Sequence, residues 1–124
     1  MQGVATDNKL MIEDYLQALS GQAKTEALMD RFITDPALKE HIRSTETAFP
    51  RYELEAQQLV AEGDMVAMRA TFRGTHRGVF AGIAPTGKAV SAELMLFYRL
   101  ADGRIAEHWM QLDVTGLMRQ LAGS

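Results

Sequence analysis

The spacing of apolar residues changes near residue 50, and this change constrains the fold more than any other feature of the chain. Before it, apolar side chains recur at helical intervals, as Leu38, Ile42 and Phe49 do along one helix face. After it, apolar and polar residues alternate in segments joined by glycine turns, which is typical of β-strands. Helices followed by an antiparallel meander predict an α+β protein, with N-terminal helices packed on a curved, mainly antiparallel sheet.

The same pattern gives approximate bounds for the elements, within a single expected domain of residues 1–124. The expected N-caps are Asp7, Thr25, Asp35 and Thr115, whose short side chains can accept a free backbone N–H. Pro36 supports the third helix start, because proline is favoured at the first helical position. The expected helices span residues 7–19, 26–33, 36–49 and 115–121, and the expected strands span residues 52–61, 65–75, 89–100 and 104–114.

Side chains alternate across a strand, so each predicted strand has one nearly apolar face and one mixed face. The apolar sheet face comprises Val66, Met68, Ala70, Phe72, Val90, Ala92, Leu94, Leu96, Tyr98, Ala106, His108, Met110 and Leu112. The mixed sheet face comprises Glu93, Met95, Phe97, Arg99, Glu107, Trp109, Gln111 and Asp113. We expect the apolar sheet face to meet a second copy of the chain in a homodimer. The mixed sheet face is then expected to line a pocket on the side of the helices.

The turn at Asp102-Gly103 decides whether these faces are continuous between the last two strands. A simple two-residue loop would place Tyr98 opposite Glu107. A type I turn with Gly103 in the left-handed conformation, followed by a bulge, would instead pair Leu100 with Arg104. We favour the second register, because a one-residue slip would scramble both faces.

Composition excludes several classes of protein. Thirteen basic residues against sixteen acidic ones leave a net charge of −3, which argues against nucleic-acid binding through bulk electrostatics. The chain has no cysteine, and His41, His76 and His108 are too widely spaced to form a metal-binding motif. No apolar run approaches the roughly 20 residues that span a bilayer. The first residues lack the pattern of a signal peptide, so we expect a cytoplasmic protein with no membrane partner.

The second half of the chain carries a series of short motifs in a specific order. They are Ala61-Glu62-Gly63-Asp64, Gly74-Thr75-His76-Arg77-Gly78, Pro85-Thr86-Gly87-Lys88, Asp102-Gly103-Arg104-Ile105 and Glu107-His108-Trp109, followed by Asp113 and Gln120-Leu121. Their order and spacing resemble the SnoaL-like polyketide cyclases, or predicted ester cyclases, of the nuclear transport factor 2-like superfamily. The resemblance covers about residues 10–122. It implies a cone-shaped α+β domain with an apolar pocket, often dimeric through its sheet, which closes a ring by an aldol reaction without metal or cofactor.

The resemblance also implies catalytic residues. The family's acid/base aspartate lies four residues after the tryptophan, which is Asp113 after Trp109 in this chain. Arg99 stands where the family's cyclases carry an assisting histidine, and an arginine can hold an anion but cannot shuttle protons. Asp113 could instead cap the last helix or pair with an arginine. We add His76 as a third catalytic candidate, whose alternative role is to hydrogen-bond the following loop.

Five further residues are expected to bind substrate. They are Trp109, Glu93, Phe97 and Gln111 of the mixed sheet face and Tyr15 of the first helix. Trp109 could equally serve packing alone, and Glu93 could neutralise an arginine in an ionic network. The expected function is cofactor-free acid/base chemistry on a small apolar carbonyl compound, and the alternative is a non-catalytic module that binds an apolar metabolite.

Overall fold

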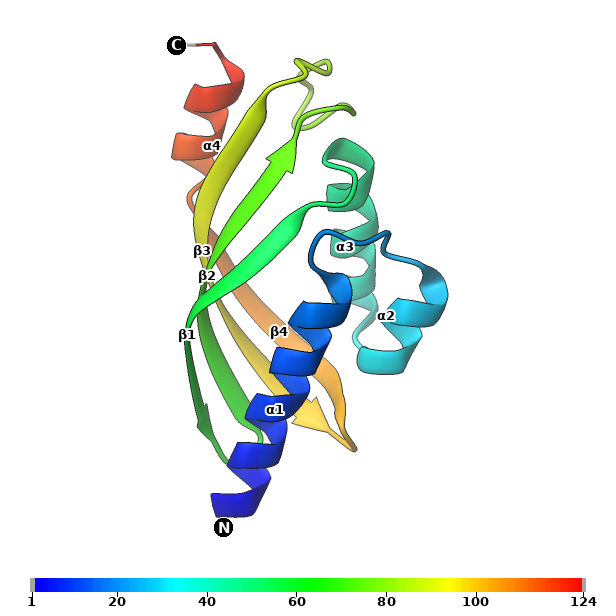
Figure 1. Ribbon diagram of the computed structural model, residues 1–124, viewed down its shortest axis with the longest axis vertical. Coiled ribbons are helices and arrows are strands. Elements are labelled where there is room, and N and C mark those ends of the chain that lie inside the picture. The colour runs from blue at the N-terminus through cyan, green and yellow to red at the C-terminus, as the bar shows by residue number, and fades with distance from the viewer. Residues whose placement is uncertain (1, 124) are drawn as a thin grey trace.

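The computed structural model describes residues 2–123 and is built on a curved, antiparallel four-stranded sheet (Figure 1). Its strands are β1 (Glu53–Glu62), β2 (Met65–Thr75), β3 (Ala89–Ala101) and β4 (Arg104–Leu112). They are hydrogen-bonded in the order β1-β2-β3-β4, so each strand pairs with its neighbour in sequence. The meander predicted from the alternating pattern is confirmed.

Three helices precede the sheet and lie on one side of it, and a fourth follows β4 (Figure 1). They are α1 (Gln2–Leu19), α2 (Glu26–Phe32), α3 (Pro36–Ala48) and α4 (Val114–Leu121). None of the helices within residues 2–123 is long and apolar enough to cross a membrane.

Two of the four predicted helix caps are confirmed. Thr25 Oγ1 accepts the N–H of Leu28 at 3.1 Å, and Asp35 Oδ1 accepts the N–H of Ala37 at 2.9 Å. The other two are wrong. Helix α1 already begins at Gln2, so Asp7 lies inside it, and Asp113 rather than Thr115 caps α4.

The β3–β4 turn differs from the predicted type but keeps the predicted faces. Asp102 and Gly103 both have positive φ, at 52° and 76°, as the two central residues of a type I′ turn do. Leu100 therefore pairs with Ile105, and the predicted pairing with Arg104 is wrong. A register shift next to this pair leaves Ala106 unpaired, and from there on odd residues of β3 face odd residues of β4. This bulge preserves the two sheet faces.

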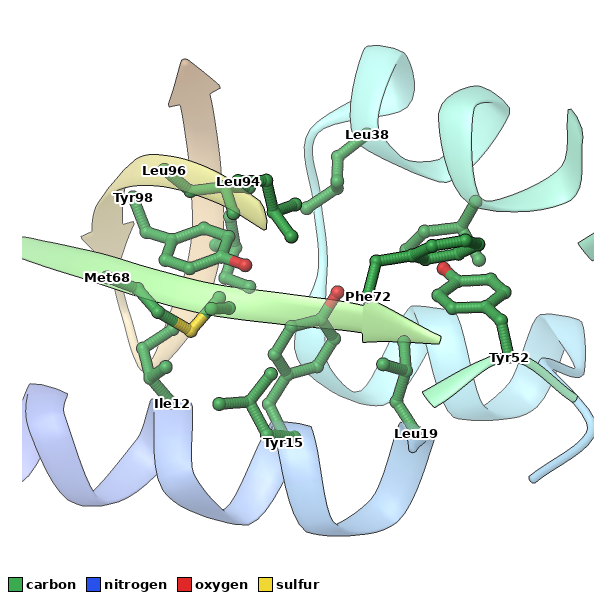
Figure 2. Packing of buried hydrophobic residues seen from close by; sticks show 14 of the residues in the cluster. Ile12, Tyr15, Leu19, Leu38, Tyr52, Met68, Phe72, Leu94, Leu96 and Tyr98 are labelled. Atoms are coloured by element: carbon green, nitrogen blue, oxygen red, sulfur yellow. The ribbon is translucent and has the colours of Figure 1, made fainter. Parts of the chain in front are cut away.

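The helices cover the apolar sheet face, which corrects the expectation that this face meets a second copy. Figure 2 shows Ile12 and Tyr15 of α1 packed toward Met68 and Tyr98 of the sheet. The large apolar side chains of the mixed sheet face, Met95, Phe97 and Trp109, are exposed. Burying the apolar face is favourable by about 25 cal/mol per Å² of apolar area, whereas burying the charged groups of the mixed face would be costly.

Candidate functional site

An apolar cavity of about 60 Å³ lies between the apolar sheet face and helices α1 and α3. A single water needs roughly 10–15 Å³ by this measure, so the space suits several waters or a small ring. No Asp, Glu, Lys or Arg is among the residues that line it. The aromatic lining residues are Tyr15, Phe49, Tyr52, Phe72, Phe80 and Tyr98.

His41 of α3 is the ionisable base of this lining. Its side chain is half-buried, and its ring has no hydrogen-bond partner among the described residues. Burial lowers the pKa of His41 below its ordinary 6.5, and the nearby His108 lowers it further. The imidazole is therefore neutral at pH 7, with one nitrogen free to accept a proton.

A second histidine is held by an aspartate next to the cavity. His108 Nδ1 of β4 lies 2.8 Å from Oδ2 of Asp35, the N-cap of α3, and both side chains are largely buried. The N–H of Thr34 donates to the carbonyl of Ile105, which fixes the start of α3 against β4. Burial alone would raise the pKa of Asp35. Hydrogen bonds from His108 and from backbone N–H groups outweigh it, so the pKa lies below 3.8.

Of the eight site residues predicted from the sequence, Tyr15 lines the cavity. Glu93, Gln111 and Asp113 lie together around a shallow hollow on the opposite side of the sheet, next to Arg69. Asp113 is exposed there, and its Oδ1 accepts the N–H of Gly116 at 2.9 Å as the cap of α4.

Three more of the predicted residues lie on the mixed sheet face, away from the cavity. Phe97 and Trp109 are cross-strand partners and are 53% and 49% exposed. Arg99 Nε donates to Glu107 Oε1, so the arginine is engaged in an ion pair.

His76 is fully buried beneath the β2–β3 connection. Its Nδ1 accepts the N–H of Thr86 at 3.2 Å, and its ring packs 5.5 Å from that of Phe49. Phe49 lines the cavity, and His76 does not. The loop-bonding role that the sequence left open for His76 is the one its contacts support.

Sequence reasoning left His41, the His108–Asp35 pair, Tyr52 and Tyr98 out of the site. A signal for two of them was present, because Tyr98 and His108 are polar side chains on an otherwise apolar strand face. Polar groups that a sequence places on its buried face need partners or a ligand. The described residues contain no cluster of three or more His, Asp or Glu side chains that could hold a metal ion.

Comparison with known proteins agrees with this fold. AcmA from Streptomyces galilaeus, an aklanonic acid methyl ester cyclase, is 35% identical over 68 residues, which are 55% of this chain and 47% of AcmA. The chain thus matches about half the length of that relative. The crystal structure of AclR from the same organism superposes with a TM-score of 0.82 at 26% identity, covering 97% of this chain and 83% of AclR.

TsrD from Streptomyces laurentii gives a TM-score of 0.78 at 27% identity, covering 96% of this chain and 97% of TsrD. These matches confirm the predicted nuclear transport factor 2-like α+β fold. The family model described as SnoaL-like polyketide cyclase matches residues 13–121. By this match, which spans nearly all of its length, the chain belongs to the SnoaL-like polyketide cyclase family.

Proposed function

We propose that this protein binds a small, mainly apolar carbonyl compound in the cavity and catalyses a cofactor-independent acid–base reaction on it. The reaction class is an intramolecular aldol closure or related carbon-acid chemistry. The observation that carries the proposal is His41, a neutral imidazole that faces an apolar cavity and has no hydrogen-bond partner among the described residues. AcmA, which the chain resembles over 68 residues, is a cyclase of an ester.

His41 has the properties that such a reaction requires. In the first step the free ring nitrogen takes a proton from the carbon next to a carbonyl, and the C–H electron pair becomes the enolate. In the second step the enolate carbon bonds to another carbonyl carbon of the same molecule, whose oxygen becomes an alkoxide. The imidazolium then returns the proton to that oxygen, so atoms and charge balance. Because burial lowers the pKa of His41 below 6.5, its ring is in the proton-accepting form near neutral pH.

His108 supports His41 electrostatically, because it lowers the pKa of His41 beyond the effect of burial. Asp35 positions the His108 ring, with Oδ2 2.8 Å from Nδ1. His108 thus helps to keep His41 in its neutral, proton-accepting form.

The competing assignment is Asp113, which the family resemblance implies as acid/base group. Its carboxylate is exposed and caps α4, on the far side of the sheet from the cavity. We therefore favour His41. The two assignments are separated by deuterium loss from 2-indanone labelled at its α carbons, followed by NMR. Loss of catalysed exchange in His41→Gln with retention in Asp113→Asn supports the proposal, and the reverse pattern contradicts it.

A non-catalytic binding module is the second candidate function. The observation that favours it is the absence of charged side chains from the cavity lining, which leaves few groups to drive a reaction. If the unmodified protein binds the ligand but does not catalyse deuterium loss from 2-indanone, the binding module is the function.

We also propose that the protein forms a homodimer through the mixed sheet face. Met95, Phe97 and Trp109 form an exposed apolar centre there, each 49–60% exposed. Arg69 and Arg99 stand beside Glu93 and Glu107 on the same face, so charges of both signs are available to a two-fold related copy. An exposed patch of this kind is typical of an interface.

A further inference from the structure

All three tyrosines of the chain line the cavity. Tyr15 lies on α1, Tyr52 directly precedes β1, and Tyr98 lies on β3. Among the described residues, no hydrogen bond reaches any of the three hydroxyls. The side chains are otherwise enclosed, with the residues only 1–3% exposed.

The hydroxyls keep contact with the cavity. Among the described residues, His76 Nε2 is the one side-chain nitrogen or oxygen that is fully enclosed and also lacks a hydrogen-bond partner. The tyrosine hydroxyls lack a partner too, so they are not fully enclosed and retain some accessible surface. The cavity is the space that adjoins them. Figure 2 shows the hydroxyls of Tyr15 and Tyr98 turned toward the same interior space, and the two rings lie 6.2 Å apart, nearly perpendicular.

We infer that the hydroxyls of Tyr15 and Tyr98 form a binding site for a carbonyl oxygen of the ligand, with Tyr52 as a further hydroxyl in the cavity lining, which makes the cavity selective for uncharged aromatic ketones and related carbonyl compounds. The inference rests on the proposed function and assigns these residues a part in it. A carbonyl oxygen has two lone pairs and can accept from two hydroxyls. When an enolate forms, its oxygen carries the negative charge and gains from every such donor.

The environment keeps the three hydroxyls as donors. Burial raises the pKa of each tyrosine well above its ordinary 10, so they stay protonated throughout the physiological range. No cation lines the cavity to hold a carboxylate or phosphate. The ligand is therefore neutral in its ground state, and its acceptor oxygen takes hydrogen bonds from the hydroxyls.

A purely structural role does not require these hydroxyls. Tyr15 packs edge-on against Tyr98 and lies 5.6 Å from Phe32, and Tyr52 lies 5.4 Å from Phe72. Phenylalanine would make the same ring contacts without leaving a polar group in an apolar site. Thr45, by contrast, also lines the cavity but donates its hydroxyl to the carbonyl of His41 at 2.8 Å, so its polar group is already used.

The test compares acetophenone with cumene, which has nearly the same shape but no oxygen. Calorimetry gives the ratio of their affinities for the unmodified protein, Tyr15→Phe, Tyr98→Phe and the double variant. We expect the acetophenone-to-cumene ratio to fall about tenfold or more when the hydroxyls are removed. Thr45→Val, which removes a hydroxyl that is already bonded, is the matched control and should leave the ratio unchanged.

A second measurement uses the unmodified protein alone. Because all three tyrosines line the cavity, ¹³Cζ-tyrosine labelling reports on this site and nothing else. Acetophenone should shift these signals more than cumene does. Binding of both ligands with an unchanged ratio in every variant would overturn the oxygen site and leave the proposed cavity function standing. No binding of either ligand, with unmoved tyrosine signals, would overturn both.

Discussion

His108 Nδ1 lies 2.8 Å from Asp35 Oδ2, and this contact joins the last strand to the first turn of α3 across 73 residues of sequence. It connects the sheet and the helical layer beside the cavity. Asp35 has two roles, because its other oxygen caps α3 by accepting the N–H of Ala37.

The first prediction separates these two roles. Asp35→Asn keeps a side chain that can cap a helix but removes the charge that His108 faces. We expect the free energy of unfolding at pH 7 to fall by about 1.5–3 kcal/mol, the usual range for a hydrogen bond to a charged group. Urea denaturation measures the change. Asp30→Asn, whose carboxylate pairs with Lys39 at the surface, is the control and should have a much smaller effect.

The same pair should show a defined pH dependence. The pKa of Asp35 lies below 3.8 in the folded protein because hydrogen bonds outweigh the effect of its burial. Its contribution to stability is therefore fully present above pH 3.8 and is lost as the pH falls through the folded pKa. The stability difference between the unmodified protein and Asp35→Asn should shrink over that acidic range. A difference independent of pH would show that the charge of Asp35 is unimportant.

The second prediction concerns the titration of His41. Burial lowers its pKa below 6.5, and His108 lowers it further, so His108→Gln should raise it toward 6.5 without reaching it. NMR of the imidazole Cε1 proton measures this directly. Because the unfolded chain binds the proton more tightly, the His41 contribution to stability is lost as the pH falls below about 6.5. If the His41 pKa were unchanged in His108→Gln, His108 would have no electrostatic effect on His41.

The third prediction concerns the loop that carries Phe80 into the cavity. The N–H groups of Arg77 and Gly78 both donate to the carbonyl of Ala48, at 2.9 and 3.1 Å. A Cβ atom on Gly78 would lie 2.2 Å from the carbonyl oxygen of Thr47, so Gly78→Ala must push the loop away from α3. We expect a lower melting temperature and weaker ligand binding. Gly103→Asn is the control, because its side chain meets open space and asparagine tolerates positive φ.

The strand pattern predicted much of the fold because alternation is a direct consequence of the pleat. It predicted β2 with the observed bounds and grouped the residues of the two sheet faces correctly except at the start of β4, where Ile105 rather than Ala106 lies on the apolar face. The strand pattern could not predict which β4 residue pairs with Leu100. Asp-Gly is compatible with more than one turn, and the type I′ turn with an unpaired Ala106 produces the same faces as the predicted one from Glu107 onward.

The site was harder to predict, because it depends on which sheet face the helices cover. Aromatic and charged residues on the mixed sheet face suggested a lined pocket, yet Phe97 and Trp109 are exposed. The cavity instead draws on residues from α1, α3 and β3, such as Tyr15, His41 and Tyr98, which helical spacing alone classes as core or surface. Their convergence is a property of helix placement, which local patterns do not encode.

The fourth prediction tests the proposed dimer. Phe97→Asp places a charge in the apolar centre of the mixed sheet face, where Phe97 is 53% exposed and Trp109 is its cross-strand partner. The unmodified protein should sediment as a dimer at micromolar concentration, and Phe97→Asp as a folded monomer. Val79→Asp, at an exposed position on the β2–β3 connection, should remain dimeric. A monomeric unmodified protein would contradict the dimer.

The last prediction distinguishes the roles of Asp113 and His41. If Asp113 serves as the cap of α4, Asp113→Asn should preserve stability, because asparagine is an equally good cap. Asp113→Ala should lower the free energy of unfolding by about 1 kcal/mol.

Both Asp113 variants should keep the catalysed loss of deuterium from α-labelled 2-indanone. His41→Gln should lower that rate by about 100-fold or more, the range for removal of a general base. The rate of the unmodified protein should rise with pH through the pKa of His41, below 6.5, because its neutral form accepts the proton. Loss of exchange in Asp113→Asn at unchanged stability would return the acid/base role to Asp113 and place the reaction on the mixed sheet face.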